Sequence, residues 1–306
     1  LKVHWPYLES DHVLNIAYNA LCGGRTLGDI ELRRNDRVFL SAIGAESIPD
    51  PTTAGDFCRR FDEDAVMALQ NVFNEVRLEV WRAQGPDFTR RTARIDADGT
   101  MVSTYGACKE GMDISYNGTW GYHPLVVSLE NTKEPLFIKN RSGNRPSHEG
   151  VIPLFEQSIA LVRRAGFTDV LLRGDSDFSL THQFDRWDED GVRFVFGYDT
   201  RANMVQLADA HPEHLYQHLV TQAERAMDVE VRAHQPDVKD RIVRERGFTT
   251  LRTRAEQLVD FEYRPTACRK TFRVVALRKT IDVTKGQDVL FQEFRYFFYI
   301  TNDLAL

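Results

Sequence analysis

The second half of the chain contains a strand, an acidic turn, a helix and another strand in succession. An apolar run at residues 170–172 predicts the first strand, and a second run at 192–198 predicts the last. The turn between the first strand and the helix reads Gly-Asp-Ser at residues 174–176. Asp175 therefore lies just past the C-terminal end of a strand, the edge where open α/β sheets place ligands and chemistry. A role as a turn residue or helix cap suits Asp175 equally well.

Two further aspartates end another predicted strand. Apolar and charged residues alternate over residues 93–97, and the run ends in Asp-Gly-Thr. Asp96 and Asp98 are two residues apart, so both leave this strand on the same face. Carboxylates from neighbouring strand ends can hold two Mg²⁺ or Mn²⁺ ions for phosphoryl transfer. The alternative is that Asp98 belongs to an ordinary Asp-Gly turn and that Asp96 is a solvent-exposed residue.

Length and composition limit the other classes of protein. The 306 residues are enough for two domains, or for one domain with an insertion. A net charge of −6 argues against a uniformly basic nucleic-acid coat but leaves room for a local basic groove. The four cysteines form no CxxC pair, which argues against a zinc site or a disulfide framework. No apolar run approaches membrane-spanning length, so we expect no membrane partner.

The periodicity changes divide the chain into four segments. Residues 1–90 are predicted to form a helical module that either binds DNA or serves as a cap or dimerisation domain. Residues 91–199 are predicted to fold as an α/β core in the order βββ-α-β-α-β, with its second and third strands at 119–130 and 134–140. Residues 200–301 follow as a mostly β insertion, helical and charged up to about 245, and residues 302–306 start a C-terminal helix.

The Asp-x-Asp-Gly-Thr motif resembles the nucleophile motif of haloacid-dehalogenase-type phosphatases. That resemblance implies Asp96 as nucleophile and Asp98 as acid/base. The family also has a Gly-Asp-x-x-x-Asp motif, but here Ser179 stands where its final acid should be. Three consecutive strands after the motif also suit that doubly wound fold poorly. We keep the phosphatase as an alternative.

Six other segments together resemble DDE transposases of bacterial insertion sequences, in the group numbered thirteen-eighty within the set that carries the YREK signature. These are residues 11–19 (DHVLNIAYN), 48–61 (IPDPTTAGDFCRRF), 118–129 (GTWGYHPLVVSL), 140–150 (NRSGNRPSHEG), 172–176 (LRGDS) and 296–302 (YFFYITN). The resemblance covers nearly the whole chain. Its segments are specific in combination and weak one by one.

This resemblance implies an RNase H-like catalytic core, a β-rich insertion and a site of three metal-binding carboxylates. The first carboxylate is Asp98 or Asp96, and we favour Asp98 because an acid closely followed by Thr is the usual pattern. Sharing of the metal site by Asp96 and Asp98 is the other alternative. The second is Asp175, and the implied cofactor is Mg²⁺ or Mn²⁺. The third is a Glu on a helix after the insertion, for which this chain offers none, since Glu293 precedes the last strand. We therefore expect a truncated protein without strand-transfer activity of its own.

The implied partners are terminal inverted repeats and target DNA. An intact enzyme of this family would hydrolyse the 3′-end phosphodiester and use the 3′-hydroxyl to attack target DNA, with a homodimer bound to both ends. A non-catalytic DNA-binding remnant or inhibitor is the alternative.

Several side chains are candidates for DNA contacts. Lys139, Arg141, Arg145 and His148 belong to a polar, partly basic loop that can bind phosphates. Trp120 can stack on a base, although aromatic residues in strands more often belong to the core. Arg244 and Arg246 belong to a basic run in the insertion, where a solvated surface is the alternative.

Overall fold

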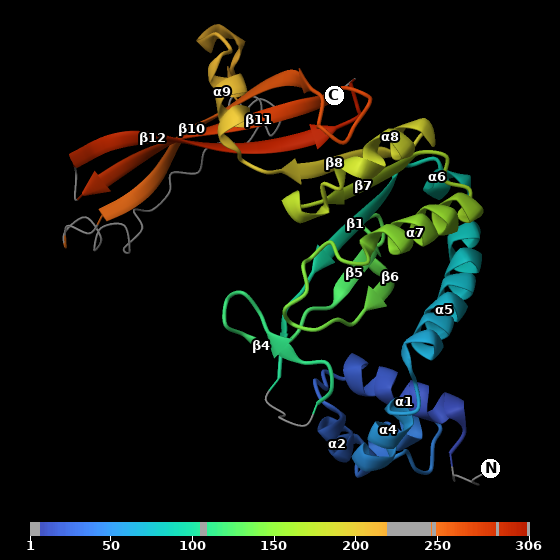
Figure 1. The fold of residues 1–306 in the computed structure, drawn as a ribbon. Coiled ribbons are helices and arrows are strands. Elements are labelled where there is room, and N and C mark those ends of the chain that lie inside the picture. The colour runs from blue at the N-terminus through green and yellow to red at the C-terminus, as the bar shows by residue number, and fades with distance from the viewer. Residues whose placement is uncertain (1–6, 105–108, 219–245, 247–248, 286–287, 305–306) are drawn as a thin grey trace, which may run out of the picture. The chain divides into compact units, whose positions relative to one another are not determined.

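The structure, a computed structural model, describes residues 7–104, 109–218, 246, 249–285 and 288–304 (Figure 1). The chain divides into two compact units, Leu1–Glu75 and Val76–Leu306. The division falls inside helix α5 (Glu63–Ala83). Trp81, near the end of α5, packs edge-on against Phe167, so the last turns of this helix belong to the second unit.

The first unit is helical. A small core of Ile30, Ile48 and Ala54 holds it together. Its other elements are α1 (Glu9–Leu21), η1 (Leu27–Asp29), α2 (Ile30–Arg34), α3 (Arg37–Ala42) and α4 (Pro51–Cys58).

Apolar positions within residues 26–42 predict a single helix in the helical module, and this prediction is wrong. Asp36 interrupts it, because its carboxylate accepts hydrogen bonds from the backbone N–H groups of Val38 and Phe39. These bonds satisfy donors at the start of a new helix, so α3 begins there separately from α2.

The second unit contains a nine-stranded mixed sheet in the order β6-β5-β1-β7-β8-β12-β11-β10-β9. Strand β1 is antiparallel to β5 and parallel to β7, β7 is parallel to β8, and β8 is antiparallel to β12. The strands are β1 (Ala93–Gly99), β5 (Leu125–Leu129), β6 (Glu134–Lys139), β7 (Val170–Gly174), β8 (Arg193–Tyr198), β9 (Gln217–His218), β10 (Thr249–Tyr263), β11 (Phe272–Lys285) and β12 (Asp288–Thr301).

The strand predicted over residues 119–130 is divided between two sheets. Its first part, β4 (Trp120–Tyr122), pairs with β2 (Val102–Ser103) and β3 (Asp113–Ile114) in a separate three-stranded sheet. Its second part is β5. Pro124 lies between the two parts and has no N–H to donate to a strand ladder, which explains the break.

Helices cover the large sheet. Helix α7 packs on β1, β5, β6 and β7, and α8 packs on β8. The helical elements of this unit besides α5 are α6 (Pro86–Thr89), α7 (Val151–Ala165), η2 (Ser176–Phe178), α8 (Thr181–Glu189), α9 (Ala202–Asp209) and η3 (Glu213–Leu215).

An aromatic cluster joins α8 to the centre of the sheet. Phe184 and Trp187 of α8 are fully buried, as are Phe194 and Phe196 of β8. Phe184 stacks on Phe194 with 4.3 Å between ring centroids, and Phe272 of β11 lies edge-on to both rings. Buried aromatic side chains dominate core energetics, so this cluster fixes α8, and with it the turn that precedes α8.

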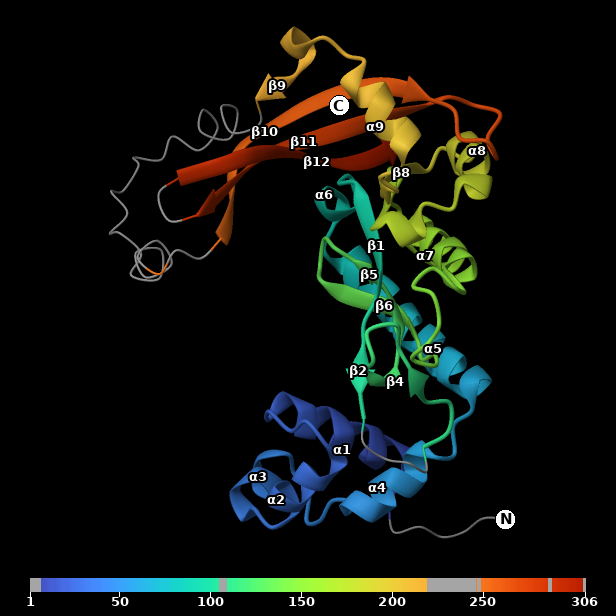
Figure 2. The same cartoon turned by 60° about the vertical axis from the view of Figure 1, so that its left-hand side comes forward.

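The β insertion predicted within residues 200–301, here called the second β region, continues the same sheet, since β12 pairs directly with β8 (Figure 2). The apolar runs at 289–291 and 295–300 predict two separate strands in this region, and that prediction is wrong, because β12 is one long strand. Residues 302–304 are not helical: the Asn302 side chain accepts a hydrogen bond from the Phe194 N–H at 2.9 Å. The helical prediction for 219–245 falls outside the described residues, as do 305 and 306.

Within the described residues, no helix is long and apolar enough to cross a membrane.

Candidate active site

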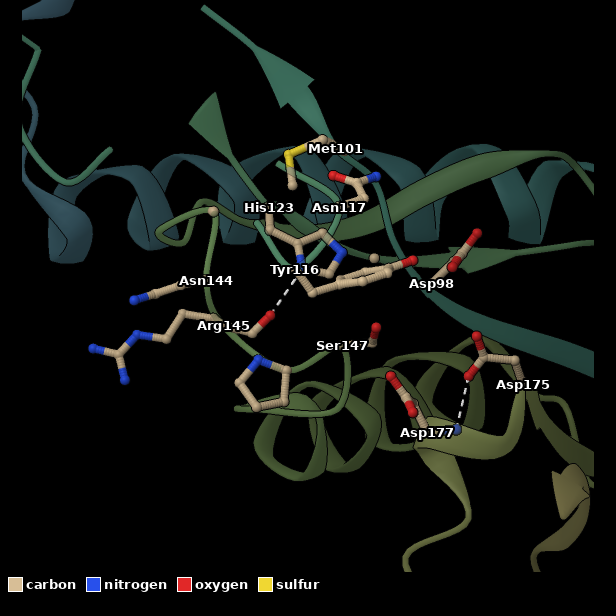
Figure 3. A pocket seen from close by; sticks show the side chains of 13 residues that line it. Asp98, Met101, Tyr116, Asn117, His123, Asn144, Arg145, Ser147, Asp175 and Asp177 are labelled. Atoms are coloured by element: carbon tan, nitrogen blue, oxygen red, sulfur yellow. Dashed lines mark hydrogen bonds between the residues drawn. The ribbon is translucent and has the colours of Figure 1, made fainter. Parts of the chain in front are cut away.

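Strands β1 and β7 lead into a cavity of about 410 Å³. Asp98 of β1 and Asp175, which directly follows β7, both line it. These residues are far apart in sequence, and the parallel pairing of β1 with β7 brings them to one edge of the sheet. Figure 3 shows Asp98, Asp175 and Asp177 toward one side of the cavity, with Asn144 and Arg145 on the opposite side.

Asp98 and Asp96 share a face of β1 but have different surroundings. The Arg173 guanidinium binds both Asp96 oxygens, with Nε–Oδ1 and Nη2–Oδ2 distances of 2.7 Å. The cross-strand pairing of Asp96 with Arg173 places the two side chains next to each other. Asp98 lies two residues further along β1. It lines the cavity, whereas Asp96 does not.

Asp175 caps the short helix η2. Its carboxylate accepts a hydrogen bond from the Asp177 N–H at 2.9 Å, so the capping role weighed from the sequence is present. Partial burial raises the pKa of Asp175, and the nearby charges of Asp177 and Asp98 raise it further, while the hydrogen bond from the Asp177 N–H acts in the opposite direction. The structure thus concentrates negative charge around this carboxylate.

Two glycines, Gly174 and Gly197, leave the space that the turn at residues 175–178 occupies. A methyl group on Gly197 of β8 would lie 2.7 Å from the backbone nitrogen of Ser176, and one on Gly174 would lie 2.8 Å from Phe178 Cβ. Any larger residue at either position would displace the turn. The close packing of the turn on β8 therefore depends on the absence of side chains at these two positions.

Asp177 is an acidic residue of the cavity that the sequence analysis missed. It stands only two residues after Asp175, in the same turn, and that spacing is the signal that could have identified it. His123, Tyr116, Asn117 and Ser147 also line the cavity without having been singled out as candidates.

Arg141 holds the loop on the other side of the cavity. It is buried, and its guanidinium donates hydrogen bonds to four backbone carbonyls at distances of 2.7–3.0 Å. Burial lowers the pKa of Arg141, but a guanidinium remains charged at any physiological pH. Nε and Nη1 of Arg141 bind backbone carbonyls, and Nη2 is buried without a hydrogen-bond partner among the described residues, so direct contact of Arg141 with DNA stays a prediction that its burial disfavours. The carbonyls belong to His123, Pro146, Ser147 and Glu149.

The other predicted DNA contacts lie at different places. Arg145 is exposed and lines the cavity. Its Nη1 lies 3.4 Å from Oε1 of Glu149. His148 lines a second cavity of about 400 Å³, which shares Asp177 with the first. Trp120 of β4 is 46% exposed, so it is not a core residue.

Four more residues that the sequence brought into consideration remain to be placed. Lys139 is half-buried at the end of β6, and Arg246 is exposed. Arg244 falls outside the described residues. Glu293 lies on β12, where it pairs with Arg295, and does not line the acidic cavity.

The donor set suits a hard divalent cation. Asp98 and Asp175 offer carboxylate oxygens, which Mg²⁺ and Mn²⁺ prefer. Among the described residues, no three His, Cys, Asp or Glu side chains lie close enough together to hold an ion as a group. Two carboxylates still fit Mg²⁺, which usually keeps several water ligands and takes one or two from the protein.

The phosphatase alternative fits the geometry poorly. It requires Asp96 as a free nucleophile, but Arg173 occupies both oxygens of that carboxylate. It also requires a doubly wound parallel sheet. In this sheet, β5 lies next to β1 and pairs antiparallel with both β1 and β6.

Comparisons with known proteins concern the family to which the chain belongs. Among solved structures, the chain is similar to a piggyBac transposase in a synaptic complex with hairpin DNA, determined by cryo-electron microscopy, at 12% sequence identity and a TM-score of 0.41. That similarity covers 98% of this chain and 53% of the other, so the chain spans about half the length of that transposase. No curated protein sequence matches the chain. A family model described as transposase DDE domain group 1 matches residues 6–291, and the chain therefore belongs to this family of DDE transposase domains.

Proposed function

We propose that this chain carries two of the three metal-binding acids of an insertion-sequence transposase, an enzyme that cleaves DNA and transfers its strands, and that the cavity between Asp98 and Asp175 is their site. The observation that carries the proposal is that these two aspartates meet at adjacent strand ends. The strand order β6-β5-β1-β7-β8, in which β5 runs antiparallel to its neighbours β1 and β6 while β7 and β8 run parallel to β1, supports an RNase H-like core. A bacterial source in the thirteen-eighty group is part of this proposal.

Asp98 and Asp175 would hold Mg²⁺ or Mn²⁺. When bound, such ions activate an attacking oxygen and stabilise a leaving oxygen in phosphoryl transfer. Asp98 is positioned by the hydrogen bonds of β1, and Asp175 by its cap on η2. Arg173 forms an ion pair with Asp96, and the Asp96 carboxylate does not line the cavity. Asp98 is thus our candidate for the first catalytic acid, and Asp175 is our candidate for the second.

The loop opposite the acids would bind the DNA backbone. Arg145 supplies an exposed positive charge at the cavity, and Arg141 keeps the loop in place through its four hydrogen bonds. His148 and Lys139 lie near the same loop, and exposed Trp120 offers a surface for base stacking. Arg246 would contribute a contact from the second β region.

The reaction has two steps and requires two DNA ends. Water would attack the phosphodiester at the 3′ end of the element, and the released 3′-hydroxyl would then attack target DNA. Terminal inverted repeats and target DNA are the proposed partners. Two ends must react together, so we propose that a homodimer binds them.

Iron-directed cleavage of the polypeptide tests the metal site without relying on turnover. Fe²⁺ with ascorbate and peroxide should cut the chain near residues 98 and 175, and Mg²⁺ or Mn²⁺ should compete. Asp98→Asn and Asp175→Asn should abolish the cuts, while Asp96→Asn should leave them. Unchanged cutting in Asp98→Asn would overturn the site. Binding of end DNA without any metal-directed cuts would instead favour the non-catalytic DNA-binding protein.

A further inference from the structure

His123 lies between β4 and β5 and lines the acidic cavity (Figure 3). Its Nδ1 lies 2.9 Å from the backbone oxygen of Arg145, on the loop opposite the acids. A carbonyl oxygen only accepts hydrogen bonds, so Nδ1 must carry the hydrogen. In the neutral ring this leaves Nε2 as a bare acceptor. The structure thus fixes both the orientation of the ring and its tautomer.

The acceptor nitrogen faces the end of β1. A methyl group on Gly99 would lie only 2.4 Å from His123 Nε2, so this nitrogen occupies the space that the glycine leaves free. Gly99 lines the same cavity and directly follows Asp98. Within the part of the chain that the structure describes, the His123 side chain makes no hydrogen bond other than the one to Arg145. Nε2 is therefore available for a ligand next to the proposed first catalytic acid.

The chemistry of DNA limits which of its groups can meet such an acceptor. Backbone phosphates carry no hydrogen at neutral pH, and they are acceptors themselves. Most base donors are engaged in pairing, and deoxyribose lacks the 2′-hydroxyl of RNA. The 3′-hydroxyl at a strand end is the hydrogen donor that the DNA backbone retains. An acceptor beside Asp98 therefore suits a terminal 3′-hydroxyl rather than an internal phosphate.

We propose that His123 Nε2 accepts a hydrogen bond from the terminal 3′-hydroxyl of a DNA strand and so orients this group at the carboxyl end of β1. The inference rests on the proposed function, because that hydroxyl is the nucleophile of strand transfer. His123 would act by binding and positioning the hydroxyl.

Binding of modified DNA ends tests this role without turnover. The probes are short duplexes that end in a 3′-hydroxyl, in a 3′-hydrogen or in a 3′-phosphate, with 2-aminopurine at the last nucleotide so that fluorescence reports occupancy of the end. Ca²⁺ replaces Mg²⁺. One neutral hydrogen bond corresponds to a preference of about threefold to tenfold for the hydroxyl over the 3′-hydrogen end. Wild-type protein should show this preference, and the 3′-phosphate end should bind no better than the 3′-hydrogen end.

Two substitutions at His123 separate positioning of DNA from support of the loop. His123→Asn keeps a donor for the Arg145 carbonyl but removes the atom at Nε2, so it should melt like wild type and lose the preference. The longer side chain of His123→Gln places its amide oxygen near the Nε2 position, so this variant should restore part of the preference for the 3′-hydroxyl end. His182→Asn, an exposed histidine on α8, is the matched control and should keep the full preference.

The outcomes distinguish the two proposals. Equal binding of hydroxyl and hydrogen ends by wild type, or a full preference in His123→Asn, would overturn the role of His123 while leaving the transposase proposal intact. Failure of wild type to bind any of the duplexes would overturn the proposed function, and this inference with it.

Discussion

Arg173 on β7 holds Asp96 of β1 with two parallel hydrogen bonds of 2.7 Å each. Such a two-point contact is the strongest geometry for a guanidinium and a carboxylate. It gives the two aspartates of the Asp-x-Asp motif different roles. Asp96 joins β1 to β7, and Asp98 is left facing the cavity.

Asparagine substitutions should separate these roles. Asp96→Asn should lower the free energy of unfolding by about 1 kcal/mol or less, because the ion pair is partly solvated, and should retain Mn²⁺ binding. Asp98→Asn should lose Mn²⁺ binding with little change in stability. Calorimetric titration with Mn²⁺ and thermal melts measure both effects. Loss of Mn²⁺ binding in Asp96→Asn alone would reverse the assignment.

The negative charge of Asp175 should lower the stability of the folded protein when no metal is bound. Its pKa is raised by burial and by the charges of Asp177 and Asp98, so its ionised form is disfavoured in the folded protein at neutral pH. Asp175→Asn keeps a capping acceptor and removes the charge, so it should raise the melting temperature without metal. Mn²⁺ should stabilise wild type but not this variant. A lower melting temperature for the variant in EDTA would contradict the charge argument.

Arg141 and Arg145 should respond differently to removal of their side chains. Arg141→Ala removes a hydrogen-bond donor from four carbonyls, of which the one of Pro146 keeps a second donor in the Glu149 N–H, and should lower the free energy of unfolding by roughly 2–4 kcal/mol. Arg145→Ala should hardly change stability, but should weaken DNA binding and flatten its salt dependence. Chemical denaturation and binding titrations at several salt concentrations measure the pair. Equal destabilisation by both substitutions would show that the loop depends on both.

Trp120 should report DNA binding by fluorescence. It is 46% exposed, whereas Trp81 and Trp187 are buried, so iodide should quench Trp120 preferentially among these three. Bound DNA should protect it if a base stacks on the ring. Trp120→Phe should keep part of the affinity and Trp120→Ala should lose about 1–3 kcal/mol of binding free energy. Iodide quenching that is the same with and without DNA would argue against stacking.

Glu130 should make stability depend on acid pH. Hydrogen bonds from Lys133 and Arg94 lower its pKa from 4.5 to about 2. The folded state therefore binds the proton less readily than the unfolded chain, and the stabilisation is full above pH 4.5 and is lost as the pH falls toward 2. The difference in melting temperature between wild type and Glu130→Gln should shrink over that interval. A difference that stays constant with pH would show that charge is not involved.

Local sequence patterns identified the elements on both sides of the cavity. Alternation over residues 93–97 predicted β1, and the apolar run before Asp175 predicted β7, because side-chain periodicity follows from backbone geometry alone. Both aspartates were predicted as strand-end acids on this basis. That they line one cavity follows from the parallel pairing of β1 and β7, which no local pattern encodes.

The family resemblance already favoured Asp98 over Asp96, but only the tertiary structure showed a physical difference between these two residues, and between Arg141 and Arg145. In each pair the sequence offers the same residue type twice within a few positions, with equal intrinsic chemistry. The difference comes from partners distant along the chain or across the loop, Arg173 for Asp96 and four carbonyls for Arg141. The sequence by itself determined which chemical groups are present and which elements carry them. The packing of those elements decided which groups are occupied by the protein and which remain available for metal and DNA.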